Sequence, residues 1–170
     1  TERFRFVEHE PPPWHYLKYL RYLESYGAVG LGSRYTGVFA PHDIGPDGKW
    51  IRKKDPFELG MPMNTREEMI RALVVARGGA GKFGVRNPVQ LLKDATDAFH
   101  ADGAVLPLWL SGVGCVYGMR EIGVGLAEKG ISVFHYEGSQ PGDRRDLDET
   151  RMLDQIDVWM ELNGLKRLED

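Results

Sequence analysis

The chain has 170 residues, of which 42% are hydrophobic and 28% charged, with a formal net charge of −3. This size and composition are typical of a single folded domain, and the slight negative charge argues against a nucleic-acid-binding protein. No apolar run approaches the roughly 20 residues that span a bilayer. The single cysteine excludes an intrachain disulfide and favours a cytoplasmic location. Because the chain starts at Thr1 rather than methionine, we expect a processed product or a domain of a longer subunit.

The first third of the chain predicts two strands, one helix and a long loop. Charged and apolar residues alternate over Arg3–Glu8, which indicates a strand. After a triple proline, the apolar spacing over Trp14–Tyr26 predicts a helix that stops at Gly27, and Ala28–Leu31 predicts a short second strand. From Gly32 to Asp55 glycine, proline and charge predominate. This pattern predicts a surface loop with at most one small turn element, and such long loops usually serve function or assembly.

Two helices are predicted in the middle of the chain. Thr65–Arg77 is expected to start at Asn64 as N-cap, with Glu67 completing a capping box. Pro88–His100 is expected to follow Asn87 as cap, with its proline in the first turn. The glycine-rich segment between the two helices resembles a phosphate-binding loop only superficially, since it lacks the required spacing and follows a helix rather than a strand.

A strand, a glycine-rich turn, a helix and a second strand come next. The strands are predicted at Ala104–Leu110 and Ile131–Tyr136, the helix at Met119–Lys129, and a last helix at Leu147–Leu162. Strands that alternate with helices favour a parallel sheet. The sequence therefore predicts a single α/β domain over residues 1–170, a Rossmann-like three-layer fold with a four-stranded parallel sheet flanked by helices.

The glycine-rich turn is the strongest candidate for chemistry. It holds Gly112, Gly114, Cys115 and Gly118, and it follows a strand at the sheet edge where α/β proteins bind ligands. Cys115 has three interpretations: a small buried apolar residue, a nucleophile, or a thiolate ligand stabilised by a helix N-terminus. A nucleophile would need a base such as His135, although a histidine within a strand usually packs. The five histidines show no metal-ligand spacing and are expected to be solvated or structural.

A nucleotide-dependent oxidoreductase remains an alternative. The turn nearly matches a dinucleotide fingerprint, and Glu137 ends the next strand, where such domains keep the acid that binds the ribose. Tyr117, however, occupies the place of the third glycine and would obstruct helix–strand packing. Three further residues, Trp14, Arg34 and Tyr35, follow the first two strands on the same expected edge and could line a pocket.

Short motifs in a fixed order carry a family likeness. They are Pro11–Trp14, Leu23–Val29, Ala101–Val105, Gly114-Cys115, Gly118-Met119, Lys129–Val133, Glu137–Ser139 and the segment Arg144–Glu161. Together they resemble the C-terminal half of subunits of the benzoyl-CoA reductase/2-hydroxyacyl-CoA dehydratase family. The likeness covers nearly the whole chain, is strongest over Asp102–Leu168 and is weak over Gly32–Gly84.

The resemblance implies a cytoplasmic oxidoreductase of anaerobic aromatic degradation. In such subunits a [4Fe–4S] cluster lies between two Rossmann-like domains, and an ATP-hydrolysing activator protein supplies single electrons for an acyl-CoA thioester. A homologous second subunit is the other implied partner; nucleic acid and membrane are not expected.

Cys115 matches the cluster cysteine of the second domain. The glycines of its loop, Gly112, Gly114 and Gly118, would let the backbone approach the cluster. Tyr117, together with Trp14, Arg34 and Tyr35, would contact substrate. One thiolate cannot hold a cluster, so the other ligands belong elsewhere in the parent protein. We therefore expect the isolated chain to bind no iron and to be inactive.

The sequence leaves three alternatives to a reductase domain. The first is a 2-hydroxyacyl-CoA dehydratase subunit of the same family. The second is the nucleotide-dependent oxidoreductase. The third is a non-catalytic assembly module whose long Gly32–Asp55 loop docks a partner subunit.

Overall fold

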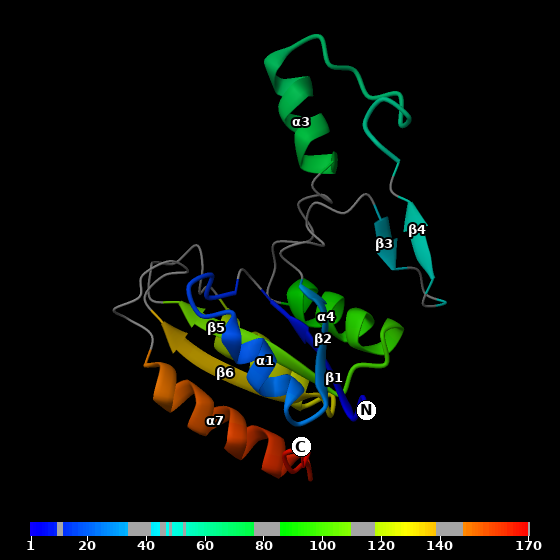
Figure 1. The fold of residues 1–170 in the computed structure, drawn as a ribbon. Helices are drawn as coiled ribbons and strands as arrows, with labels where there is room; N and C mark the ends of the chain where they lie inside the picture. The colour runs from blue at the N-terminus through cyan, green and yellow to red at the C-terminus, as the bar shows by residue number, and fades with distance from the viewer. Residues whose placement is uncertain are drawn as a thin grey trace.

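Four parallel strands form the central sheet, in the order β2-β1-β5-β6. Their bounds are Phe4–Glu8 for β1, Ala28–Ser33 for β2, Gly103–Trp109 for β5 and Ser132–Gly138 for β6. The computed structural model describes residues 1–9, 12–33, 42–44, 47, 49–52, 54–76, 86–109, 118–138 and 148–169. Helices cover both faces of the sheet (Figure 1). The predicted α/β Rossmann-like three-layer fold is confirmed.

The two faces of the sheet carry separate apolar cores. The helices are α1 (Lys18–Glu24) and α7 (Glu149–Leu162) on one face, and α4 (Arg86–Ala98) and α6 (Met119–Ala127) on the other. Side chains alternate along each strand, so Phe6 packs under α1 and α7 while its neighbour Val7 packs under α4 and α6. The first core is rich in aromatic side chains, and the second is mostly aliphatic.

The strand order reverses between β1 and β5. From β1 the chain crosses through α1 to β2 at one edge, and from β5 it crosses through α6 to β6 at the other. Crossovers between parallel strands are right-handed in nearly all proteins, so crossovers that run in opposite directions place their helices on opposite faces. The observed positions of α1 and α6 agree with this rule. A reversal of this kind opens a crevice at the carboxyl ends of the two strands that flank it.

The predicted long loop contains a small antiparallel sheet, so its assignment as an almost unstructured loop was wrong. The sheet pairs β3 (His42–Ile44) with β4 (Trp50–Arg52). The chain then leads to α3 (Arg66–Ala76), which stands apart from the main sheet (Figure 1). Ala72 of α3 is buried, whereas five apolar side chains of this helix are exposed: Met69, Ile70, Leu73, Val74 and Val75.

The N-cap of α3 lies one residue later in the chain than predicted. The Thr65 hydroxyl accepts a hydrogen bond from the backbone N–H of Glu68 at 3.2 Å, and the Glu68 carboxylate accepts from the N–H of Thr65 at 3.0 Å. This is a reciprocal capping box. The prediction of Asn64 and Glu67 was therefore wrong, although the same carboxylate also accepts from the N–H of Asn64 at 2.9 Å.

Two other helices begin elsewhere than predicted. The α1 helix starts at Lys18 instead of Trp14, because the chain after the prolines first forms a tight turn in which Tyr16 N–H donates to the Pro13 carbonyl at 2.7 Å. The α4 helix starts at Arg86, so Asn87 lies inside its first turn and is not its cap. The last helix agrees more closely with prediction, since Asp148 caps α7 and Gly164 follows it with a φ of 74°.

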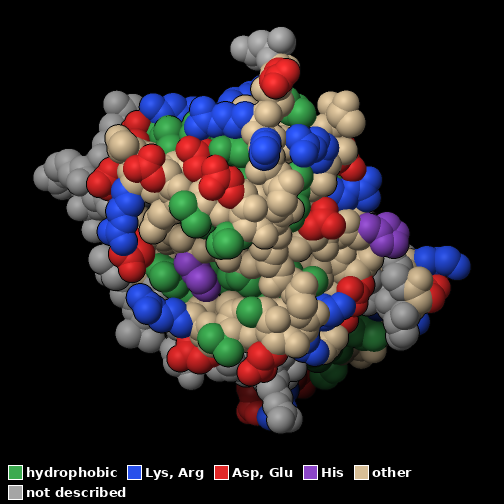
Figure 2. All heavy atoms as spheres, turned by 90° about the horizontal axis from the view of Figure 1, so that it is seen from below, with side chains coloured by type: hydrophobic (Ala, Val, Ile, Leu, Met, Phe, Trp, Pro, Cys, Tyr) green, Lys and Arg blue, Asp and Glu red, His purple; other side chains and the backbone are tan. Residues whose placement is uncertain are grey.

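Surface charges are mixed in sign. On the face seen in Figure 2, acidic and basic side chains lie side by side with small apolar areas between them. Salt bridges join α1 to α7 and α6 to β6, for example Lys18 to Glu149 at 2.8 Å and Arg120 to Glu137 at 3.6 Å. None of the described helices is both long and apolar enough to cross a bilayer.

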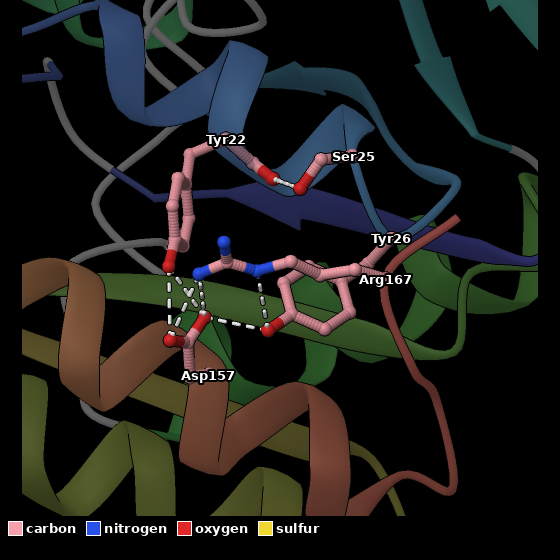
Figure 3. Close-up of polar contacts among 5 residues, drawn as sticks. All are labelled: Tyr22, Ser25, Tyr26, Asp157 and Arg167. Carbon is pink, nitrogen blue, oxygen red and sulfur yellow. Dashed lines mark hydrogen bonds and ion pairs between the residues drawn. The ribbon is translucent and has the colours of Figure 1, made fainter. Parts of the chain in front are cut away.

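A polar cluster around Asp157 joins α1, α7 and the C-terminal segment (Figure 3). The Asp157 carboxylate accepts hydrogen bonds from the hydroxyls of Tyr22 at 2.7 Å and Tyr26 at 2.5 Å, and Arg167 donates to it at 3.1 Å. The Arg167 guanidinium also lies 4.5 Å from the ring centroid of Tyr22. Burial and the hydrogen bond to Asp157 raise the pKa of Tyr26. The cluster holds the two helices together over the aromatic core.

We predict that Asp157→Ala lowers the free energy of unfolding by about 1.5–3 kcal/mol, because three donors lose a charged acceptor. Urea denaturation followed by circular dichroism measures the change. Asp154→Ala is the matched control, since Asp154 is exposed one turn earlier on α7 and should change stability by about 0.5 kcal/mol or less. Equal effects of the two substitutions would contradict a stabilising role for the cluster.

Candidate functional site

The carboxyl ends of β1 and β5 flank the strand-order reversal and form the candidate site. The β1 strand ends at Glu8 and β5 ends at Trp109. In the sequence, residues 110–117, which include the only cysteine, lie between β5 and α6. Six predicted site residues lie outside the described part of the chain: Arg34, Tyr35, Gly112, Gly114, Cys115 and Tyr117.

A partly buried carboxyl group, that of Glu8, is the main chemical feature of the edge. Glu8 accepts a hydrogen bond from the hydroxyl of Tyr19 on α1, and the ring of Tyr19 lies 6.2 Å from that of Tyr136 on β6. Burial raises the pKa of Glu8 above its usual 4.5, and the Tyr19 hydrogen bond offsets this only in part. Burial and then the nearby Glu8 raise the pKa of both tyrosines. Perturbed groups at such an edge are candidates for function.

Two aromatic side chains near the same edge, Trp109 and His15, carry buried polar atoms that have no hydrogen-bond partner in the described part of the chain. Trp109 is 0% exposed, and its indole Nε1 has no hydrogen-bond partner among the described residues. Its ring packs edge-on against Tyr136 with centroids 5.5 Å apart. Both ring nitrogens of His15, in the segment between β1 and α1, are likewise buried without a described partner. Since buried polar groups in folded proteins are nearly always hydrogen-bonded, these atoms mark an unusual polar environment.

Only two of the predicted site residues are described. Trp14 lies in the turn after β1, and its side chain is 53% exposed. Gly118 has a φ of 74° and is the N-cap of α6. This left-handed conformation strains any residue with a Cβ atom, so the turn itself explains the glycine.

The residues that supported the alternative chemistries have structural partners. Glu137 is half-exposed and lies 3.6 Å from Arg120 and 3.9 Å from Arg151. His135 packs between strand and helix: its Nδ1 lies 3.2 Å from the Leu106 carbonyl, and a Cβ atom at Gly123 would meet its Nε2 at 2.3 Å. Burial lowers the pKa of His135. The expectation that this histidine packs is confirmed.

A shallow groove of about 530 Å³ runs between α1, α7 and the C-terminal segment. It is lined by Tyr16, Lys18, Arg21, Tyr22, Ser25, Leu153, Arg167 and Leu168. Each of its three cations is paired with a carboxylate: Lys18 with Glu149, Arg21 with Glu24 and Arg167 with Asp157. The groove therefore offers no unmatched positive charge for an anionic ligand. We place the candidate site at the ends of β1 and β5.

The described residues do not fit an iron–sulfur cluster by themselves. In this part of the chain no three His, Cys, Asp or Glu side chains come together as metal ligands. The whole chain contains one cysteine, whereas clusters are usually held by several. Ligands from another segment or polypeptide would be required.

A scan of the chain against protein-family models gives no match, and neither does a search of curated proteins. The family likeness of the short motifs is therefore a hypothesis, and the site is argued from its own geometry.

Sequence reasoning missed Glu8, Tyr19, Trp109 and Tyr136 as site residues. A signal for Glu8 was present in the strand alternation. Phe4, Phe6 and Glu8 share one face of β1, and the two phenylalanines are buried. A glutamate on the same strand face as two buried phenylalanines is expected to have a desolvated carboxyl group.

We predict that Glu8→Gln becomes progressively more stable than the wild type as the pH rises from 4 to 8. The folded-state pKa of Glu8 is raised, so its contribution is most favourable below the unfolded pKa and is lost as the pH rises through the folded value. Glutamine keeps the shape without the charge. Urea denaturation at a series of pH values measures the difference, with Glu24→Gln on the exposed side of α1 as control. A difference that stays constant with pH would contradict a raised pKa.

Proposed function

We propose that the chain is a domain of an iron–sulfur subunit of an ATP-dependent, benzoyl-CoA reductase-like enzyme that passes single electrons to a CoA thioester. The observation that carries the proposal is the position of the only cysteine. In the sequence, Cys115 falls between β5 and α6, and β5 is one of the two strands that flank the reversal of strand order. The motif likeness to this family supports it, and a 2-hydroxyacyl-CoA dehydratase subunit is the closest variant of the same proposal.

In this proposal Cys115 is one ligand of a cluster whose other thiolates come from elsewhere. Thiolates are the usual ligands of such clusters, and the N-terminus of α6 would favour an anionic sulfur. The described residues contribute the scaffold, with Gly118 turning the chain into α6. The homologous second subunit and the ATP-dependent activator protein are the proposed partners.

Iron analysis tests this proposal. The tagged chain is isolated without oxygen, together with the polypeptides that co-purify with it, and its iron and acid-labile sulfide are measured. We expect Cys115→Ser and Cys115→Ala to reduce both, because a ligand is lost. Val124→Ser, at an exposed position of α6, is the control and should leave both unchanged. An iron content that does not depend on Cys115 would contradict the assignment.

A titration with NAD or NADP addresses the rival enzyme class. We expect no saturable binding, because Glu137 is engaged by two arginines and Tyr117 replaces the third glycine of the fingerprint. Micromolar affinity would instead favour a nucleotide-dependent oxidoreductase.

The assembly module is the second candidate function, and the exposed apolar side of α3 favours it. Ile70 is 49% and Leu73 65% exposed on a helix that stands apart from the main sheet (Figure 1). Contiguous exposed apolar side chains mark interaction surfaces. In this candidate function, α3 docks a partner subunit of the same complex.

We predict that the double substitution Ile70→Ser, Leu73→Ser releases the partner subunit from the purified complex without unfolding the main sheet. Co-purification measures the release, and circular dichroism checks the fold. The control is Val124→Ser, Val158→Ser, which removes exposed apolar side chains from α6 and α7 instead. An intact complex after the α3 substitutions would exclude this docking surface.

A further inference from the structure

We propose that the outer edge of β6 pairs with β6 of a second copy of the chain, so that two copies share one continuous sheet. The two strands run antiparallel about a two-fold axis perpendicular to the sheet, because two identical edges can meet in one sheet only in this way. The same axis brings α6 against α6 and α7 against α7. The partner is a second copy and not the homologous subunit of the proposed function, so the inference does not depend on that function.

The β6 strand is a long and regular edge of the sheet (Figure 1). It pairs with β5 over all seven of its residues in unbroken register, and on its other side it has no partner among the described strands. The opposite edge, β2, differs: its register with β1 shifts between Gly30 and Ser33, and Gly32 has a φ of 151°. Such an irregularity protects an edge from pairing with another chain, and β6 lacks one.

On one face of the sheet, α7 turns an exposed apolar stripe toward the edge of β6. Asp157 marks the flank of α7 that faces α1, since it accepts hydrogen bonds from two tyrosines of that region. Arg151, Val158 and Leu162 are separated by whole helical turns and lie on the opposite flank. The ion pair of Arg151 with Glu137 at 3.9 Å shows that this flank faces β6. On it, Val158 is 55% and Leu162 81% exposed.

On the other face, α6 has a matching stripe. Gly125 marks the flank of α6 that faces α4, where an added Cβ atom would lie 3.0 Å from a valine side chain of that helix. Arg120, Val124 and Ala127 lie on the opposite flank and are exposed. Arg120 lies 3.6 Å from Glu137, so this flank also faces the edge of β6. The edge is therefore bordered by exposed apolar side chains on both faces, a feature of interaction surfaces.

The dimensions of this edge suit a dimer. Seven residues of strand are about 23 Å long, and two helix layers with a sheet between them are about 30 Å thick, which gives roughly 700 Å² per copy. This area reaches the standard size of a stable protein interface. Because α7 packs over β5 and β6, pairing at the usual strand spacing places the two α7 helices about 10 Å apart, a normal distance for packed helices.

The charges along the edge favour the antiparallel arrangement. At the carboxyl end of β6, Arg120 and Arg151 surround a single glutamate, Glu137, which leaves a net positive charge. At the amino end, α6 finishes with the exposed Glu128, whereas Lys129 extends toward α4. The two-fold axis brings the carboxyl end of one β6 beside the amino end of the other. Opposite charges then meet at both ends of the interface, which favours a second copy as the occupant.

Sedimentation equilibrium of the full chain over a concentration series tests the dimer. We expect the wild type to approach twice the 19.2 kDa mass of one chain as its concentration rises. The double substitution Val158→Lys, Leu162→Lys should raise the dimer Kd by about a hundredfold, because it places like charges on both sides of the axis. Leu17→Lys is the matched control, since it changes an exposed leucine of the segment before α1 and should leave the Kd unchanged. Circular dichroism checks that each variant is folded.

Hydrogen exchange distinguishes a continuous sheet from contacts between helices alone. We expect the backbone amides of β6 to exchange more slowly at concentrations where the dimer forms than in the dilute monomer, because strand pairing adds hydrogen bonds at this edge. The amides of β2, at the opposite edge, should exchange equally fast in both states. Protection of β2 in place of β6 would overturn the proposal.

Three further results would overturn it: a monomer at every concentration, a dimer that the lysine substitutions leave intact, or assemblies larger than two copies, since a two-fold contact closes after two. The α3 substitutions Ile70→Ser and Leu73→Ser should leave this dimer intact, which separates it from docking through α3. An iron content that does not depend on Cys115 leaves all these outcomes unaffected, so the failure of the proposed function is distinguishable from the failure of the dimer.

Discussion

The direction of the two crossovers is the constraint on which the site depends. Both β1-α1-β2 and β5-α6-β6 pair parallel strands, and they run away from each other from the centre of the sheet. Because both crossovers have the same hand, they place α1 and α6 on opposite faces of the sheet. The junction of β1 and β5 is therefore not covered by a crossover helix on both faces. The strand ends there, Glu8 and Trp109, are consequently brought to one edge from positions about 100 residues apart in the sequence.

The aromatic core beneath α1 and α7 then determines the chemistry of that edge. Phe134 and Trp159 stack with centroids 5.3 Å apart, and Tyr136 continues the layer to Trp109 and Tyr19. Partial burial beside this layer is the main cause of the raised pKa of Glu8, and the hydrogen bond from Tyr19 lowers that pKa. The surface charges have a smaller effect. Each cation of the α1–α7 groove is paired with a carboxylate, and such exposed ion pairs fix local geometry but add little to stability.

The sequence predicted the four strands of the main sheet better than it predicted the β3–β4 hairpin and the helix caps. Strict alternation and a short apolar run identified all four strands of the main sheet, because these patterns report burial directly. The β3–β4 hairpin escaped prediction because each of its strands has only three residues, too few to show a period. The cap of α3 was placed one residue early because Asn64 and Thr65 are both good cap residues, and the choice between them depends on which carboxylate, Glu67 or Glu68, reaches back.

The sequence indicated which edge of the sheet carries the candidate site, but it did not indicate which side chains come together there. The βαβ pattern located the edge, since parallel strands end where ligands bind, and the cysteine drew attention to the loop after β5. The partners of Glu8 could not be read from sequence, because Tyr19 and Tyr136 reach it from another helix and another strand. Their approach depends in turn on the Asp157 cluster, which holds α1 against α7 through Tyr22, Tyr26 and Arg167 (Figure 3). A polar contact at the far end of α1 thus supports the packing of the helix that carries Tyr19, the hydrogen-bond partner of Glu8.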